Sequence, residues 1–143
     1  MKNSIFFCLA ICLIGVVSCS KKDNASSFNL DESFTLGYNA TAQLDNKPDV
    51  KIQFIQVIED SRCPTDVQCV WAGRIVVNVT FFQNGTEQTG ALALGDITGT
   101  SYSDEFIFGD YTVKLLNAQP APKSDQSLSL TDYKIEVLVK KSK

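Results

Sequence analysis

Histidine is missing from this sequence altogether. It is the side chain that most often transfers protons near neutral pH, so its absence excludes Ser-His-Asp and Cys-His catalysis. The absence also removes the commonest ligand of transition metals and leaves cysteine, carboxylate and carbonyl groups to bind any metal. We therefore predict no catalytic residues of these kinds, no metal centre and no cofactor.

Basic residues, proline and glycine are also scarce. The chain of 143 residues has 13 Lys and Arg against 16 Asp and Glu, which gives a net charge of −3. Because the lysines are scattered among acidic residues, no basic stripe forms to neutralise a phosphate backbone, and nucleic-acid binding is not expected. Four prolines and eight glycines are too few for a low-complexity chain, whereas 44% hydrophobic and 20% charged residues are typical of a globular protein. The length predicts one folded domain.

The chain also lacks an apolar run long enough to cross a membrane. Its longest run extends from Ile5 to Val17 and falls short of the roughly 20 residues that a membrane-spanning helix needs. Because Lys2 precedes this run, the pattern predicts a signal peptide over residues 1–18.

The end of this run, Val16-Val17-Ser18-Cys19, resembles the lipobox of bacterial lipoproteins. The resemblance implies cleavage before Cys19, acylation of that cysteine and attachment to the membrane through the lipid. An uncleaved anchor or an ordinary secretory signal is the alternative. The Ser-Lys-Lys sequence that follows is similar to that of lipoproteins sorted to the outer membrane of Gram-negative bacteria. We predict a lipidated cysteine and a flexible tether over residues 19–32, because this polar stretch offers too little apolar surface to fold.

Residues 33–143 predict an all-β domain, because apolar residues recur there at every second position. The clearest alternation places Ile75, Val77, Val79 and Phe81 on one face of a strand. About seven or eight short strands joined by tight turns favour a β-sandwich of the immunoglobulin-like kind. An up-and-down β-barrel is the alternative.

Local signals refine this prediction. The dipeptide Asn84-Gly85 between two alternating segments is typical of a two-residue hairpin turn, and Gly109-Asp110 is a second hairpin candidate. The alternation that starts at Val50 loses its phase at Ile55. A β-bulge or a strand buried on both faces would explain this loss of phase.

The predicted domain contains two cysteines, Cys63 and Cys69. In an oxidising compartment such a pair predicts a local disulfide that stiffens the connection between two strands. The surrounding segment from Asp60 to Gly73 contains D-S-R-C-P and then C-V-W-A-G. It resembles a recurrent segment of small bacterial lipoproteins and secreted proteins that have no established activity. The resemblance implies a shared domain and transfers no catalytic or binding residue.

Three interpretations of this segment are open. In the first, the disulfide and Trp71 pack over one end of the sandwich, Asp60 pairs with Arg62 or Arg74, and an arginine lies against Trp71. In the second, Arg62 and Trp71 form a recognition surface on the stiffened loop, because these residue types are enriched in binding hot spots. The third is redox or metal chemistry, for which the C-x-x-C spacing and further soft ligands are missing.

Four acidic residues on predicted loops could meet in space to bind calcium or to act as an acid-base pair: Asp96, Asp104, Glu105 and Asp110. A carboxylate-dependent hydrolase acting on glycans is therefore the alternative function. The sequence favours instead a lipid-anchored cell-envelope protein without enzymatic activity, periplasmic or surface-facing. Such a protein would bind a protein or glycan partner or have a structural role at the membrane.

Overall fold

The computed structural model describes residues 26–142, which form nine β-strands and one short 3-10 helix. Along the chain these elements are β1 (Ser26–Phe28), β2 (Ser33–Gly37), β3 (Thr41–Leu44), β4 (Lys47–Asp60), β5 (Arg74–Gln83), β6 (Thr86–Gly95), β7 (Glu105–Phe108), β8 (Tyr111–Gln119), η1 (Leu130–Asp132) and β9 (Lys134–Lys141). The predicted signal peptide, Cys19 and the first part of the tether lie outside the described residues. No helix within residues 26–142 is long and apolar enough to cross a membrane.

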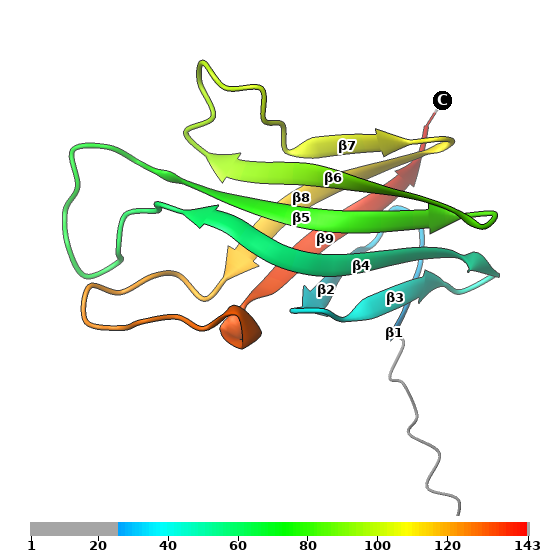
Figure 1. Ribbon diagram of the computed structural model, residues 1–143, viewed down its shortest axis with the longest axis horizontal. Coiled ribbons are helices and arrows are strands. Elements are labelled where there is room, and N and C mark those ends of the chain that lie inside the picture. Colours follow the sequence, from blue (N-terminus) through cyan, green and yellow to red (C-terminus); the bar gives the residue numbers. More distant parts are fainter. Residues whose placement is uncertain (1–25, 143) are drawn as a thin grey trace, which may run out of the picture.

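Two sheets pack against each other (Figure 1). One has five strands in the order β1-β3-β4-β5-β6, and the other has four in the order β2-β9-β8-β7. Strands β3 to β6 follow one another as antiparallel neighbours, and so do strands β7 to β9. The predicted β-sandwich is confirmed, because the described residues form two open sheets and not the closed barrel of the alternative.

The core lies between the two sheets and follows the predicted alternation. The four inward residues predicted for β5 are completely buried. The last of them, Phe81, meets the rings of Phe108 and Tyr111 from the other sheet, at centroid distances of 5.4 and 5.5 Å. The alternate residues Ile135, Val137 and Val139 of β9 are buried to the same extent. Burial of each such side chain contributes about 1.5–3 kcal/mol, so the two patterns together account for much of the drive to form the sandwich.

Strand β4 carries the irregularity that the loss of phase predicted. Its register with β5 shifts between Phe54 and Gln56 and again between Val57 and Glu59. Each shift is typical of a β-bulge, which places an extra residue in one strand and changes the face on which later side chains lie. Phe54 is completely buried before the first shift, whereas Ile58 is 47% exposed after it. The bulge interpretation is therefore confirmed.

Both predicted hairpins are present. Asn84 and Gly85 have φ angles of 51° and 76°, and they join β5 to β6 with Gln83 opposite Thr86. Two successive positive φ angles are what a type I′ turn requires. The Gly109-Asp110 turn joins β7 to β8.

The folded domain begins earlier than predicted, inside the segment expected to be a tether. Strand β1 pairs in parallel with β3, and Phe28 at its end is 3% exposed. The Phe28 ring stacks on Phe34 of β2 at a centroid distance of 4.5 Å. Strand β1 has only three residues, of which Phe28 is the one apolar residue. A strand this short shows no alternation, so the sequence pattern did not predict it. The start of the folded domain, predicted at residue 33, is therefore corrected to Ser26 within the described residues.

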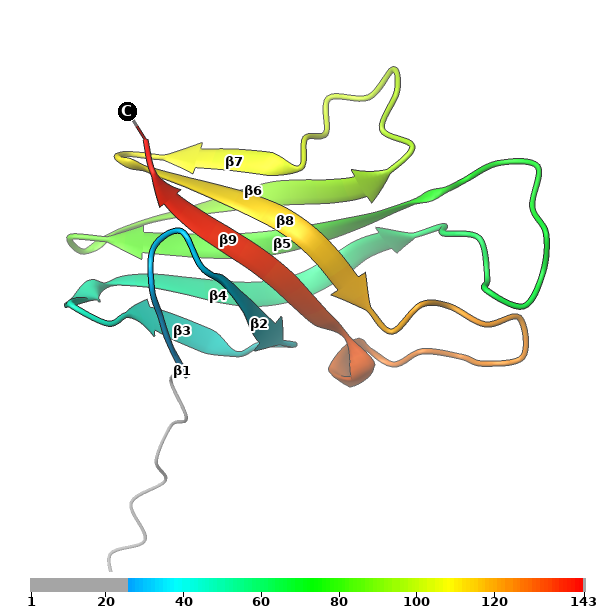
Figure 2. The same ribbon diagram turned by 180° about the vertical axis from the view of Figure 1, so that it is seen from behind.

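Two long connections lie at one end of the sandwich. Residues 61–73 join β4 to β5, and residues 120–129 join β8 to η1. Both project side by side from the same end of the longest axis, away from the β3–β4 and β5–β6 turns (Figures 1 and 2). The residues singled out between Asp60 and Gly73 lie at this end.

Candidate functional site

The predicted disulfide is present in the β4–β5 connection. Cys63 and Cys69 are bonded, with their Cα atoms 5.9 Å apart. Inside the ring that they close, the N–H of Val67 donates to the carbonyl of Pro64 at 3.3 Å. At the base of the connection, the N–H of Cys63 donates to the carbonyl of Ala72, also at 3.3 Å. The disulfide and these bonds stiffen a segment that contains no strand or helix.

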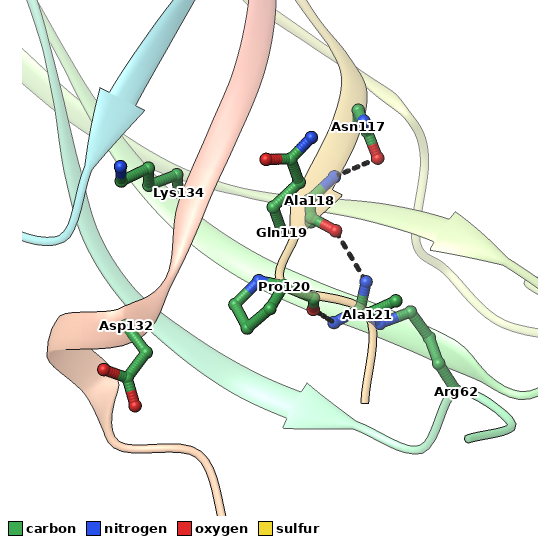
Figure 3. Close-up of a pocket in the computed structure, with 8 residues that line it drawn as sticks. All are labelled: Arg62, Asn117, Ala118, Gln119, Pro120, Ala121, Asp132 and Lys134. Atoms are coloured by element: carbon green, nitrogen blue, oxygen red, sulfur yellow. Dashed lines mark hydrogen bonds between the residues drawn. The ribbon is translucent and has the colours of Figure 1, made fainter. Parts of the chain in front are cut away.

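Arg62 connects this segment to both sheets. Its guanidinium makes a bidentate ion pair with Asp60, in which Nε donates to Oδ1 and Nη2 to Oδ2, both at 2.7 Å. Nη1 and Nη2 also donate to the carbonyls of Ala118 and Pro120 at the end of β8, at 2.6 and 2.7 Å (Figure 3). The two charged side chains are 18% and 10% exposed. Of the two arginines considered as partners of Asp60, Arg62 is therefore the one that pairs with it.

Tyr133 extends this network to the start of β9. Its hydroxyl donates to Asp60 Oδ2 at 3.0 Å, and the same oxygen accepts a hydrogen bond from Arg62. Burial, followed by the hydrogen bond to Asp60, raises the pKa of Tyr133 to about 12. The phenol therefore remains a protonated donor near neutral pH. One carboxylate thus joins the end of β4, the disulfide segment and the residue before β9.

Arg74 makes a separate and more exposed pair. Its Nη2 lies 3.1 Å from Glu59 Oε2, and its guanidinium carbon lies 5.9 Å from the ring centre of Tyr102. The expectation that an arginine lies against Trp71 is wrong, because the aromatic partner is supplied by the β6–β7 connection. Arg74 and Glu59 are 30% and 33% exposed, so their pair adds little stability.

A second set of contacts fastens the disulfide segment to the β8–η1 connection. The backbone N–H of Ser124 donates to Asp66 Oδ1 at 2.9 Å, and its hydroxyl donates to Asp66 Oδ2. The N–H of Thr65 donates to the carbonyl of Pro122 at 3.0 Å. The two hydrogen bonds from Ser124, the hydroxyl bond first, hold the pKa of Asp66 below its ordinary value. The two long connections therefore support each other.

Gly73 has a role that the sequence analysis missed. Its φ of 65° lies in the left-handed region, which side chains other than glycine rarely adopt. A Cβ atom at this position would also collide with the carbonyl of Ser61. The two ends of the connection are joined here, since the N–H of Ser61 donates to the carbonyl of Arg74 at 2.8 Å. The glycine that ends the Trp-Ala-Gly sequence is the signal that could have indicated this close approach.

The tip of the connection is apolar and exposed. We use "the tip" for Val67, Val70 and Trp71, which are 48%, 95% and 64% exposed. The expectation that Trp71 packs over the end of the sandwich is wrong. Arg62 and Cys63 are among the residues that line a hollow of about 320 Å³ there, and Trp71 does not line it. The indole is therefore directed to the surroundings of the domain.

The structure gives Arg62 and Trp71, the predicted recognition residues, different surroundings. The guanidinium of Arg62 is engaged by a carboxylate and two carbonyls, so it serves the fold. Trp71 is left as the candidate recognition residue, with Val70 directly before it and Val67 four positions earlier in the sequence.

A second hollow, a groove of about 540 Å³, is also lined in part by Arg62 (Figure 3). Asn117 and Gln119 of β8 line one wall, and Asp132 and Lys134 line the other. Aromatic residues are absent from the lining, and the side chains that face the groove are exposed. The groove therefore combines hydrogen-bonding groups with the small apolar side chains of Ala118, Pro120 and Ala121.

The four candidate carboxylates do not gather at one cleft. Asp104 and Glu105 both lie close to Lys114 Nζ, at 2.9 and 3.0 Å. Asp96 accepts a backbone N–H from its own connection at 3.1 Å, and Asp110 lies in the β7–β8 turn. In residues 26–142, no group of three or more Cys, Asp or Glu side chains is placed to hold a metal ion.

Replacement of both Cys63 and Cys69 by serine is expected to lower the free energy of unfolding by about 2 kcal/mol, because the unfolded chain loses a small closed loop. The circular-dichroism spectrum is expected to keep its β signature, since Arg62 and Asp66 still hold the segment. Urea denaturation of the oxidised wild type and the double variant measures the difference. Free thiols in unreduced wild-type protein, or loss of β structure in the variant, would contradict this prediction.

The fold and the site together define a class: a β-sandwich that presents an exposed apolar tip on a disulfide-closed, ion-pair-braced connection. No family model, curated protein or solved structure matches the chain. Function is therefore argued from these contacts and from the sequence.

Proposed function

We propose that this protein is a lipid-anchored module of the Gram-negative cell envelope that acts by binding and not by catalysis. The lipobox resemblance at Cys19 supports the anchor, and the following Ser-Lys-Lys sequence supports the outer membrane. The tip is the proposed contact surface. The observation that carries the proposal is the 64% exposure of Trp71 on a connection that is held in place from several sides.

The energetics of the tip favour a binding role over a structural one. Val70, at 95% exposure, makes almost no contact that could stabilise the fold. Burial of apolar area gains about 25 cal/mol per Å², and this gain is available at the tip for contact with a partner. Because the connection is already stiff, little conformational entropy is lost on binding. Tryptophan is also among the residue types that contribute most to binding.

The arrangement of the carboxylates gives no support to the alternative, a glycan hydrolase. That chemistry needs two carboxyl groups that face each other across the bond to be cleaved. Asp104 and Glu105 instead share one lysine. Binding without catalysis is the reading that the described contacts favour.

A photoreactive apolar amino acid at position 70, in the full-length lipoprotein in intact envelopes, tests the contact surface. We expect a cross-linked product there, with protein or with lipid, and none from the same amino acid at Gln88, which is exposed on β6 close to the turn at the other end of the molecule. Trp71→Ala is expected to reduce the product several-fold. The free energy of unfolding should change by no more than about 0.5 kcal/mol, as for an exposed side chain. Equal cross-linking at both positions would contradict the proposal.

A further inference from the structure

We infer that the tip inserts into the surface of the lipid bilayer, so that the domain contacts the membrane at a second point besides its lipid. This inference rests on the proposed anchor and names the partner of the tip. The partner proposed for the tip is the lipid bilayer, and contact with a protein instead is an outcome that the test below can detect.

The size of the tip is the first reason. A stable interface with another protein buries about 800 Å² on each partner, whereas a whole aromatic side chain supplies about 150–250 Å². One partly exposed tryptophan and two valines fall well short of the area for such an interface. The same three side chains are sufficient for a shallow contact with a bilayer that the protein already adjoins, because the lipid provides the affinity.

The chemistry of the tip is the second reason. Tryptophan concentrates at the boundary between membrane and water, where its ring is buried and its N–H remains solvated. The charged side chains of the connection are engaged elsewhere, since Arg62 binds Asp60 and the carboxylate of Asp66 accepts two hydrogen bonds from Ser124. Within residues 61–73 the one cation is thus held by the fold, the exposed carboxylate of Asp66 is hydrogen-bonded by Ser124, and the three apolar side chains of the tip are exposed.

The length of chain before the domain is the third reason. Six residues separate Cys19 from Ser26, so a lipid on Cys19 keeps the start of β1 within about 25 Å of the bilayer surface. The chain enters at β1, in one half of the long axis, and the disulfide connection projects from the other end (Figures 1 and 2). A lipid near β1 and a contact at the tip therefore hold the long axis close to the plane of the membrane.

The fluorescence of Trp71 tests this inference, because it is the one tryptophan of the whole chain. Full-length lipoprotein is reconstituted into vesicles of phosphatidylethanolamine with a minority of phosphatidylglycerol. We expect the emission to shift to shorter wavelength, quenching by acrylamide to fall several-fold, and lipids brominated on the upper acyl chain to quench strongly. The matched control carries Trp71→Phe and Gln88→Trp, and its tryptophan is expected to remain accessible to acrylamide and insensitive to the brominated lipids.

Vesicle flotation separates the failure of the anchor from the failure of the tip contact. Protein that floats with the vesicles but keeps an exposed Trp71 overturns the tip contact and leaves the anchor intact. Protein that does not float overturns both. A Trp71 that is shielded in native envelopes but exposed in lipid vesicles shows that the tip binds another envelope component, which overturns the bilayer as its partner.

Discussion

Replacement of Arg62 by alanine is expected to lower the free energy of unfolding by about 3 kcal/mol, as for the loss of one partner of a buried ion pair. The Asp60 carboxylate, 10% exposed, would lose the cation beside it. The carbonyls of Ala118 and Pro120 would also lose their donors. Urea denaturation of the purified protein, monitored by circular dichroism, measures the change in the free energy of unfolding.

Arg74→Ala is the matched control for this experiment. It removes the same kind of side chain from a pair that is about one-third exposed, so the expected loss is below about 1 kcal/mol. Arg62→Lys should recover part of the stability, because it restores the charge but not the planar fork that binds two acceptors. Equal losses in Arg62→Ala and Arg74→Ala would contradict the role given to the Asp60–Arg62 pair.

Replacement of Cys19 by alanine is expected to abolish membrane attachment, with the protein recovered in the soluble fraction or as unprocessed precursor. The reason is that lipid modification needs the thiol, and acyl chains supply about 0.8 kcal/mol of binding for each buried CH₂ group. Cell fractionation measures the distribution of the protein. Mass spectrometry of the wild type measures the mature amino terminus and its lipid.

Cys8→Ala and Cys12→Ala are the controls, because both cysteines lie in the apolar run that the predicted cleavage removes. Neither substitution is expected to change attachment. A mature amino terminus at another residue, without lipid, would show that the anchor is not at Cys19.

Features that depend on neighbouring residues could be predicted from the sequence. An alternating pattern arises whenever one face of a strand is buried, so the pattern alone was enough to predict which side chains of β5 point into the core. The Asn84-Gly85 turn follows from two residues that accept positive φ angles. The disulfide could be predicted because Cys63 and Cys69 are the two cysteines of the domain.

Features that depend on distant residues could not be predicted. Tyr133 is 73 positions from Asp60, and the carbonyls that Arg62 binds belong to the end of β8. Because the sequence does not show that these carbonyls lie near Arg62, Arg62 and Arg74 were both candidates for the ion pair with Asp60. The sequence also left open whether Trp71 is packed or exposed, because a pattern of residue types does not show which apolar side chains the core has room to bury.

The place of β2 in the four-stranded sheet determines the order in which the domain can assemble. Its neighbour is β9, and the hydrogen bond from Ser33 to Glu136 spans 103 residues. Synthesis proceeds from the amino terminus, so the meander from β3 to β6 is complete long before β9 exists. Until β9 arrives, both β2 and β8 have unpaired edges, which are sites of aggregation. Closure over so long a stretch is also slow. Strand β9, made after every other strand of residues 26–142, thus protects the edges of the strands made before it.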